Sequence, residues 1–529
     1  MKTKHFQIAH VIILFFFYIS SNAQENNKVH NPVIFADVPD ASIIRVDNTY
    51  YMSSTTMHMS PGLPIMKSKD LVNWEIVSYA YNRLIDNDAM NLNNDKNAYG
   101  RGSWASSLRY HNNTFYVSTF SATSGKTHIY STKDIERGPW EAIEFEPALH
   151  DHSLFFDDDG KIYMLYGSGS ISLVELKKDL SGVQPGTEKV IIENASQPAG
   201  DNTMLKAEGS QLFKINGTYY LFNITWPEGG MRTVIIHRAG NINGPYEGKV
   251  GLQYLGIAQC GLIDTPDGKW FSYLFRDYGA VGRTPYIIPV DWKDGWPVLG
   301  TNGKVPEILN LPAGTSLIPG IVNSDDFTRK KGQPDLPLAW QWNHNPDNRF
   351  WSLKKRKGFL RLTTGRVETN FLSAKNTLTQ RTIGPECTGY TSVDTSNMKD
   401  GDFAGLTLLQ NNYGQIGIKI DGKNKSIVMI NAGNGTPIEV ARIPVIENTV
   451  HFKATCDFTD KKDTAIFYYS IDGKNWIKTG TPLKMTYTLP HFMGYRFGLF
   501  NYATKAAGGC ADFDYYRIED KILKNSYEY

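Results

Sequence analysis

Three carboxylates in the first half of the chain occupy matching places in a repeated sequence pattern. Asp40, Asp151 and Glu208 each stand two residues before a serine, and an apolar run, a turn and an aromatic run follow. If the three acids lie together and partly shielded from water, mutual repulsion and desolvation raise the pKa of at least one of them. A protonated acid then stands beside ionised partners near neutral pH, as general acid and general base chemistry requires.

The repeated pattern is typical of a β-hairpin. In the copy that starts at Glu208, the turn Asn216-Gly217 separates an apolar run from the aromatic pair Tyr219-Tyr220. Asn-Gly between two such runs is a strong hairpin signal. Copies of the pattern start at Asp40, Trp104, Asp151, Glu208 and Gln259.

Several hairpins are followed by another strand and turn, as in KSKDLVNWE from Lys67 and STKDIERGPWE from Ser131. Each unit of roughly 50 residues therefore holds about four strands, which is close to one propeller blade. The five copies predict an all-β chain that begins with a five-bladed β-propeller. From Asp325 onward, alternating strands lack the pattern and predict a β-sandwich of the jelly-roll type.

Equivalent positions of propeller blades lie at equivalent places around the axis, so the first residues of the five copies should converge on one end of the central channel. Three converging carboxylates suit glycoside hydrolysis, in which one acid protonates the leaving oxygen and another acts on the opposite face of the sugar. Trp104 would stack on a sugar ring, and Gln259 would add an amide for sugar binding. The alternative is that the acids only cap strand ends.

Several motifs resemble glycoside hydrolase family 43. NPVIFADVPDASIIR is similar to the family's opening motif, HDHSLFFDDDGKIYMLYG to its central Asp motif, and AEGSQLFKINGTYYLF to its Glu motif. DTPDGKWF and GRTPYIIPVDWKDGWP are similar to its closing segments. SDDF followed by LAWQWNHNPDNRFWSL resembles the sandwich appended in some subfamilies.

The resemblance implies a five-bladed propeller and hydrolysis with inversion of configuration. It makes Asp40 the general base, Glu208 the general acid and Asp151 the group that tunes the pKa of the acid. An inverting pair should lie roughly 6.5–9.5 Å apart to admit a water molecule. The family's arginine falls on Arg283, which would bind sugar hydroxyls; a solvent-exposed salt bridge is the alternative role.

The chain departs from the family pattern at three places. Ala41 and Ser106 stand where prolines are usual, and Gln259 stands where many members have a histidine that organises a central calcium or water cluster. We therefore expect no metal and no cofactor, and a structural calcium remains possible but unsupported. Asp157 to Gly160 could be taken for a calcium loop but is expected to form a hairpin turn. His150 and His152 flank Asp151 without a third histidine to complete a metal site.

The leading hypothesis is an exo-acting inverting glycosidase that releases terminal α-L-arabinofuranosyl residues from plant hemicellulose oligosaccharides. A β-xylosidase, or an enzyme with both activities, is the alternative within the family. A non-catalytic, carbohydrate-binding propeller is the alternative from another class. With a net charge of +2, no nucleic-acid partner is expected.

The chain is predicted to divide into a signal peptide (1–23), a propeller (24–318) and a sandwich (319–529). Basic residues before a short apolar stretch indicate export, to the periplasm or outside the cell, and no segment is predicted to span a membrane. The four cysteines, Cys260, Cys387, Cys456 and Cys510, are expected to be mostly buried free thiols.

The sandwich has two possible roles. It could bind polysaccharide, or it could buttress the propeller. Buttressing is favoured, with the loop from Phe500 to Gly509 leaning over the end of the channel that carries the acids.

Overall fold

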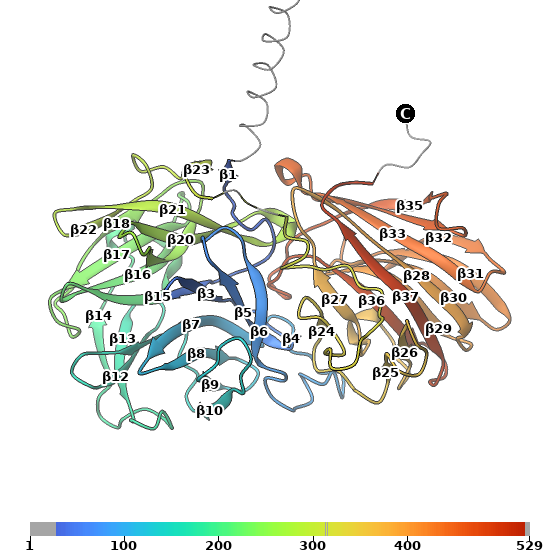
Figure 1. Ribbon diagram of the computed structural model, residues 1–529, viewed down its shortest axis with the longest axis horizontal. Helices are drawn as coiled ribbons and strands as arrows, with labels where there is room; N and C mark the ends of the chain where they lie inside the picture. Colours follow the sequence, from blue (N-terminus) through green and yellow to red (C-terminus); the bar gives the residue numbers. More distant parts are fainter. Residues whose placement is uncertain (1–27, 313, 315, 524–529) are drawn as a thin grey trace, which may run out of the picture.

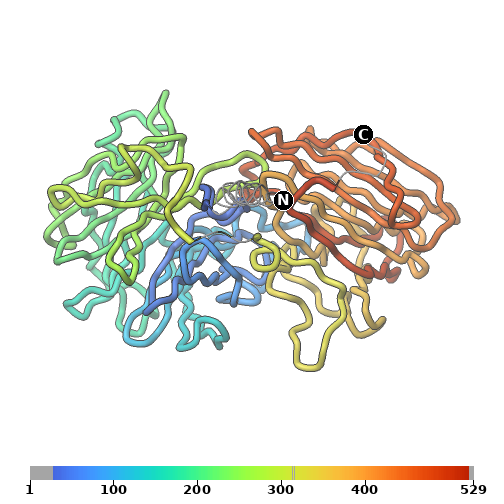
Figure 2. Tube along the Cα trace, turned by 45° about the horizontal axis from the view of Figure 1, so that its top comes forward, coloured from blue at the N-terminus to red at the C-terminus, as the bar shows by residue number. Residues whose placement is uncertain are grey.

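The computed structural model describes residues 28–312, 314 and 316–523, and shows two β-rich bodies side by side (Figures 1 and 2). The predicted signal peptide lies outside these residues. The described part of the chain has no helix long and apolar enough to cross a membrane. Its helical segments are single 3₁₀ turns: η1 (Gln197–Ala199), η2 (Gly279–Val281), η3 (Phe371–Ser373) and η4 (Thr459–Lys461).

The N-terminal body is the predicted five-bladed propeller. Each blade is an antiparallel sheet of four strands drawn from one continuous stretch of sequence. The blades are β2 (Ser42–Val46), β3 (Thr49–Ser53), β5 (Gly62–Ser68), β6 (Glu75–Tyr81); β7 (Ser103–His111), β8 (Thr114–Ser121), β9 (Lys126–Thr132), β10 (Glu141–Phe145); β11 (Ser153–Phe156), β12 (Ile162–Tyr166), β13 (Ile171–Leu176), β14 (Lys189–Ile192); β15 (Thr203–Ile215), β16 (Thr218–Pro227), β17 (Thr233–Ala239), β18 (Glu247–Leu252); and β19 (Ala258–Asp264), β20 (Trp270–Asp277), β21 (Arg283–Lys293), β22 (Trp296–Leu299).

Serines of the repeated pattern join neighbouring blades. The Ser42 hydroxyl accepts the backbone N–H of Leu108 at 3.0 Å, and the Ser153 hydroxyl accepts that of Leu212 at 3.0 Å. These contacts satisfy backbone donors on the inner strands, which have no strand partner on the side of the channel. The serine therefore recurs because it links the blades.

The ring closes between its first and last segments. β1 (Val29–His30) pairs antiparallel with β23 (Ile308–Leu309). Asn31 reinforces this closure, because its amide donates to the carbonyls of Ile287 and Pro306 at 2.8 and 2.9 Å.

The predicted turn from Asp157 to Gly160 is confirmed. The Gly160 N–H donates to the Asp157 carbonyl at 3.1 Å, and Gly160 has a φ of 78°, which glycine adopts without strain. The Asp157 carboxylate is held by Lys214 and by the Tyr219 hydroxyl, each at 2.7 Å. This acid therefore links the third and fourth blades.

The C-terminal body is a sandwich of two antiparallel sheets, as predicted. One sheet has the order β32 (Ile438–Pro444), β31 (Asn424–Asn431), β30 (Gly414–Asp421), β29 (Asp402–Leu409), β36 (Arg496–Ala503), β27 (Leu378–Arg381), β24 (Gln341–Asn343), β4 (Met59–Ser60). The other has the order β25 (Trp351–Ser352), β26 (Leu360–Thr363), β37 (Cys510–Glu519), β28 (Glu386–Asn397), β33 (Thr449–Asp457), β34 (Thr464–Ser470), β35 (Ile477–Lys484).

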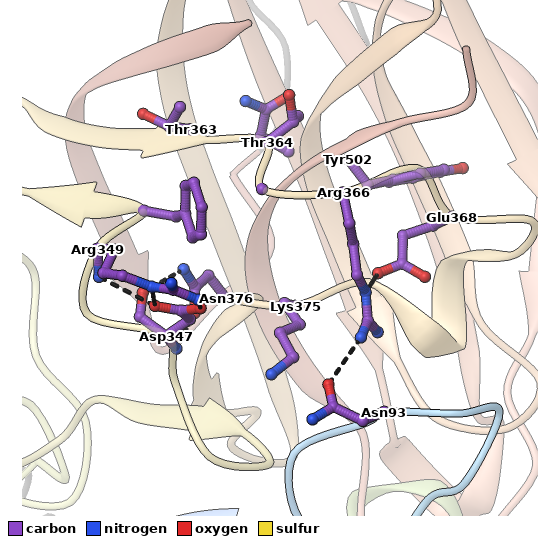
Figure 3. Close-up of a pocket in the computed structure, with 13 residues that line it drawn as sticks. Asn93, Asp347, Arg349, Thr363, Thr364, Arg366, Glu368, Lys375, Asn376 and Tyr502 are labelled. Atoms are coloured by element: carbon purple, nitrogen blue, oxygen red, sulfur yellow. Dashed lines mark hydrogen bonds and ion pairs between the residues drawn. The ribbon is translucent and has the colours of Figure 1, made fainter. Parts of the chain in front are cut away.

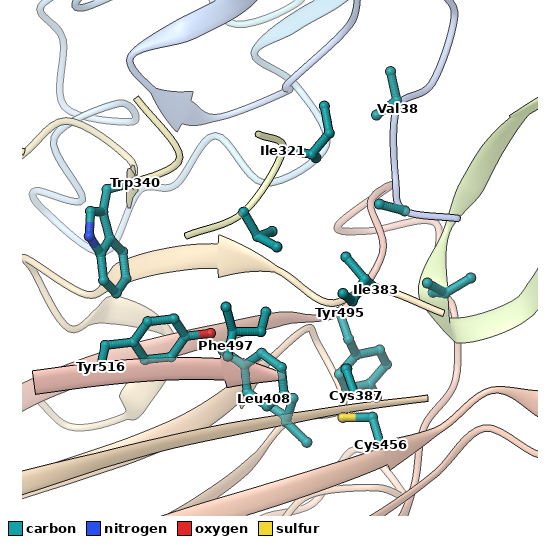
Figure 4. Packing of buried hydrophobic residues seen from close by; sticks show 14 of the residues in the cluster. Val38, Ile321, Trp340, Ile383, Cys387, Leu408, Cys456, Tyr495, Phe497 and Tyr516 are labelled. Carbon is teal, nitrogen blue, oxygen red and sulfur yellow. The ribbon is translucent and has the colours of Figure 1, made fainter. Parts of the chain in front are cut away.

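The two bodies share a sheet and a core. β4 comes from the first blade's stretch of sequence, yet it forms the edge strand of the sandwich, with Ser60 opposite Trp342. One cluster of buried side chains runs from Val38 and Ile321 at the propeller to Tyr516 in the sandwich (Figure 4). The sandwich is therefore built onto the propeller, in agreement with a buttressing role.

All four cysteines lie in the described part of the chain and are free thiols, as predicted. Cys260, Cys387 and Cys456 are buried, whereas Cys510 is partly exposed.

Removing residues 319–529 should leave a propeller that does not fold to a soluble, active protein. Met59, now 1% exposed, and other apolar side chains would face water, and burying one such side chain contributes about 1.5–3 kcal/mol. The loss of several such contacts exceeds the marginal stability of a typical protein. Soluble yield and thermal unfolding of the truncated chain measure this. A soluble propeller that keeps full activity on small substrates would disprove buttressing.

Candidate active site

The first residues of the five hairpins lie where the inner strands leave the regular ladder. Asp40, Asp151 and Gln259 have φ values of 51°, 46° and 51°, in the left-handed region that non-glycine residues seldom adopt. In the other two blades the register shifts around Trp104 and Glu208. Irregularities of this kind re-aim side chains, so each blade departs from regular strand geometry, by one of these two means, where its candidate residue stands.

Two of the three acids meet a histidine. His150 Nε2 lies 3.0 Å from a Glu208 carboxylate oxygen and 3.9 Å from one of Asp151. Ligand atoms of these three residues all lie within 4.8 Å of one another. The sequence located His150 next to Asp151 but did not show this hydrogen bond to Glu208, which crosses from the third blade to the fourth.

The expected raised pKa falls on Asp151. Burial, together with the nearby charges of Glu208 and Asp40, raises the pKa of Asp151 to about 7, although His150 opposes the shift. Burial lowers the pKa of His150, but its hydrogen bond to Glu208 and the charges of Asp151 and Glu208 outweigh this effect, so that its pKa is raised overall. A proton is therefore held in this group near neutral pH.

Asp40 lies against Arg283 in a buried ion pair. Arg283 Nη1 donates to both carboxylate oxygens of Asp40 at 2.8 Å, and the two residues are 3% and 5% exposed. The solvent-exposed role considered for Arg283 is therefore wrong. Burial raises the pKa of Asp40, and the positive charge of Arg283 limits the rise. The Asp40 carboxyl can therefore still ionise, although it is almost fully shielded from water.

Asp37, which the sequence did not single out, fixes this pair to both bodies. Its carboxylate accepts the backbone N–H of Arg283 at 2.8 Å and that of Gly494, in the sandwich, at 3.0 Å. Its carbonyl accepts from the Arg381 guanidinium at 2.8 Å. The position of Arg283 therefore depends on the docking of the sandwich.

The sandwich reaches the site through Phe492. The ring of Phe492 packs 5.2 Å from the ring of Trp104, and the Arg283 guanidinium lies 4.6 Å from its centre. Phe492 lies in the connection between β35 and β36. The prediction that the loop from Phe500 to Gly509 covers the site is wrong: its first residues belong to β36, and Gly508 bonds to Thr364.

Gln259 lies beside the acid of the fourth blade. A side-chain carbon added to Gly209, which follows Glu208, would come within 3.0 Å of the Gln259 side chain. The structure therefore places the hairpin-start residues of the fourth and fifth blades next to each other. Glycine is needed at position 209 for this approach, and also because its φ is 68°.

Comparison with known proteins agrees with this geometry. The family model for glycosyl hydrolases family 43 matches residues 29–297, and the model for the β-xylosidase C-terminal concanavalin A-like domain matches residues 324–519. The chain belongs to glycoside hydrolase family 43. The first match holds the three acids and Arg283, and the second holds Phe492.

Relatives of this family 43 glycosidase carry different activities in their names. A β-xylosidase of Formosa agariphila is 30% identical over 92% of this chain and 90% of its own length. A non-reducing-end α-L-arabinofuranosidase of Bacteroides ovatus is 27% identical over 82% and 81%. A solved structure described as a bifunctional GH43-CE of Bacteroides eggerthii has 66% identity and a TM-score of 0.93, and covers 94% of this chain. The chain spans 64% of that protein's length.

The described residues of this family 43 site offer only part of a ligand set to the calcium that the sequence left open. Calcium takes six to eight oxygen ligands, whereas the cluster of ligand atoms includes the His150 nitrogen, which is already hydrogen-bonded to Glu208. Gln259 offers one amide oxygen in place of an imidazole. We therefore derive the chemistry from side chains alone.

Phe492→Ala should lower kcat/KM by roughly tenfold, because it removes an aromatic wall of the site and the ring that packs on Arg283. Leu489→Ala is the matched control, since Leu489 lies in the same connection and is 70% exposed. Steady-state kinetics on a nitrophenyl glycoside, with thermal unfolding of both variants, measure the effect. Equal activity of the two variants would show that Phe492 does not shape the site.

The Asp151→Asn variant should lose less stability than the wild type as pH rises. The pKa of Asp151 is about 7 in the folded chain and about 3.9 when unfolded. The folded state therefore binds more protons, and stability falls as pH rises through this window. His150, whose folded pKa is also raised, loses its stabilising charge in the same direction.

We expect Asp151→Asn to raise Tm by about 2–4 °C at pH 8 and to give no gain at pH 4. Asp291→Asn, at an exposed position, serves as the control and should match the wild-type profile. The Tm of the wild type and of both variants, measured from pH 4 to 8, tests this expectation. A variant whose profile parallels the wild type would refute the raised pKa.

Proposed function

We propose that the protein is an exported, exo-acting, inverting glycosidase that releases terminal α-L-arabinofuranosyl residues from hemicellulose oligosaccharides. The observation that carries the proposal is the convergence of Asp40, Asp151 and Glu208, with a histidine on one acid and an arginine on another. A sugar-binding propeller without turnover has no need of a buried carboxylate–arginine pair beside a protonated acid.

In the proposed reaction, Asp40 accepts a proton from a water molecule as the water oxygen bonds to the anomeric carbon. The bond from that carbon to the leaving oxygen breaks, and Glu208 donates its proton to the leaving oxygen. Inversion results because water attacks from the face opposite to the leaving group. Because burial raises the pKa of Asp40, its carboxylate is a stronger base than an exposed one.

In this scheme His150 positions the general acid Glu208, and Asp151 affects the charge around it. The hydrogen bond from His150 orients the Glu208 carboxyl, and the proton retained by Asp151 limits the negative charge around it. Burial raises the pKa of Asp40, and the positive charge of Arg283 opposes the rise and favours the ionised form that a general base requires.

Phe492 and Trp104 support exo action. The Phe492 ring, from the sandwich, packs against the Trp104 ring of the propeller and lies beside the Arg283 guanidinium. The sandwich therefore walls off one side of the site, which favours the end of a saccharide chain over its middle. Apolar ring faces of this kind suit the apolar face of a sugar.

The specificity for arabinose rather than xylose is the finer part of the proposal. A β-xylosidase is the second candidate, because the Formosa agariphila relative carries that name at 30% identity. Terminal arabinofuranose and xylopyranose present similar hydroxyl patterns to a site of this kind. Relatives named xylosidase/arabinosidase, such as that of Butyrivibrio fibrisolvens, make an enzyme with both activities a related form of the proposal.

Assays of 4-nitrophenyl α-L-arabinofuranoside and β-D-xyloside side by side test the specificity. We expect faster release from the arabinofuranoside, with a product of inverted anomeric configuration seen by NMR in the first minutes. Faster release from the xyloside would transfer the assignment to the second candidate. A retained anomer would overturn the mechanism.

Asp40→Asn and Glu208→Gln should each lower kcat by about 10²–10⁴ while leaving sugar binding intact. The loss for Glu208→Gln should be smaller on the nitrophenyl substrate than on an oligosaccharide, because nitrophenolate leaves without a proton. Kinetics on both substrates, with binding measured by calorimetry, check this. Wild-type protein that releases no pentose, with both variants binding as it does, would favour the non-catalytic alternative.

A further inference from the structure

A polar cavity of about 320 Å³ lies in the sandwich beside a propeller loop (Figure 3). This volume is at the lower end of the range of about 300–1,000 Å³ for small-ligand sites. The propeller contributes Asn93 and the sandwich contributes the rest. The lining residues used below are Asn93, Asp347, Arg349, Phe350, Lys375 and Asn501.

Both carboxylates of this cavity are already neutralised by arginines. Arg349 donates to the two oxygens of Asp347 at 2.9 and 2.6 Å. Arg366 pairs with Glu368 and also donates to the Asn93 side chain at 3.0 Å. Each of the two acids therefore already has an arginine as its ion-pair partner.

Unlike Arg349 and Arg366, Lys375 is a cationic side chain of this cavity without an ion-pair partner among the described residues. It is half-buried, and within the described residues it makes no hydrogen bond or ion pair. Figure 3 shows its amine pointing into the space between the Asp347–Arg349 pair and Asn93. Burial and then the charge of Arg366 lower the pKa of Lys375, while the charges of Asp347 and Glu368 oppose the shift; the ammonium feels both acids but forms an ion pair with neither.

Other groups of the cavity suit a polyhydroxylated ligand. The Phe350 ring packs close to Gly365, where an added side-chain carbon would come within 2.7 Å of the ring, and the Arg349 guanidinium lies 5.2 Å from its centre. Asn501 is 5% exposed; its amide donates to the Leu362 carbonyl, and its oxygen has no partner in the described part of the chain. An apolar ring, amides and one free ammonium together match a sugar that carries a single negative charge.

We propose that this cavity binds a hexuronate, either as a monosaccharide or as a unit of an acidic saccharide, with the carboxylate on Lys375. One unpaired ammonium balances one carboxylate. A phosphate dianion would bring two negative charges to a cavity in which Lys375 is the positive charge without an ion-pair partner among the described residues. The inference uses none of the catalytic residues and does not rest on the proposed function.

Calorimetry or NMR titration of the wild-type protein with glucuronate, glucose and inorganic phosphate tests the site. We expect glucuronate to bind at least tenfold more tightly than glucose, and its binding to weaken as salt is raised. Glucose binding as tightly as glucuronate would overturn the proposal. Phosphate that binds more tightly than glucuronate and displaces it would overturn it as well.

Lys375→Met should weaken glucuronate binding at least tenfold, and Lys375→Arg should restore it to within about fivefold. Lys474→Met, at an exposed position far along the chain, is the control and should bind as wild type does. Hydrolysis of the nitrophenyl substrate should stay within twofold in all three variants. Unchanged glucuronate binding by Lys375→Met would refute the proposal, and if that variant fails to fold, the wild-type salt and competition data still decide.

Discussion

Arg283 and Asp40 form an ion pair that is almost entirely withdrawn from water, next to the remaining acids of the site. Removing two charges from water carries a desolvation penalty of several kcal/mol per ion, and losing one partner of such a pair costs about 3–5 kcal/mol. The pair persists because Asp37 holds the Arg283 backbone and a sandwich N–H at the same time. This one arrangement determines the protonation of the site, the position of the Phe492 ring and the docking of the two bodies.

The site divides its charges between two sides. On one side, the positive charge of Arg283 favours the ionised form of Asp40; on the other, burial raises the pKa of Asp151 to about 7 beside His150 and Glu208. Separation of this kind lets a base and an acid coexist at one pH, because each carboxyl responds to a different neighbour. Environment, rather than residue type, therefore assigns the roles.

The features that could be predicted from the sequence are those that a local repeat encodes. The Asn-Gly and Asp-Gly turns and the recurring serines define hairpins, and their equivalence predicts that Asp40, Asp151 and Glu208 converge. Asp37 and Phe492 escaped prediction because their roles arise from contact between segments far apart in the chain, which no repeat records. His150 carried a signal, its position next to Asp151, but its bond to Glu208 depends on the packing of two blades.

The pairing of β1 with β23 and of β4 with β24 joins the start of the chain to segments that are made much later. At about 5–20 residues per second, synthesis of the intervening stretch takes roughly 15–60 s. During that interval β1 and β4 lack their strand partners, and unpaired strand edges attract other chains. The ring and the shared sheet therefore make folding a late, non-local event, and protection of the growing chain becomes part of what this architecture requires from the cell.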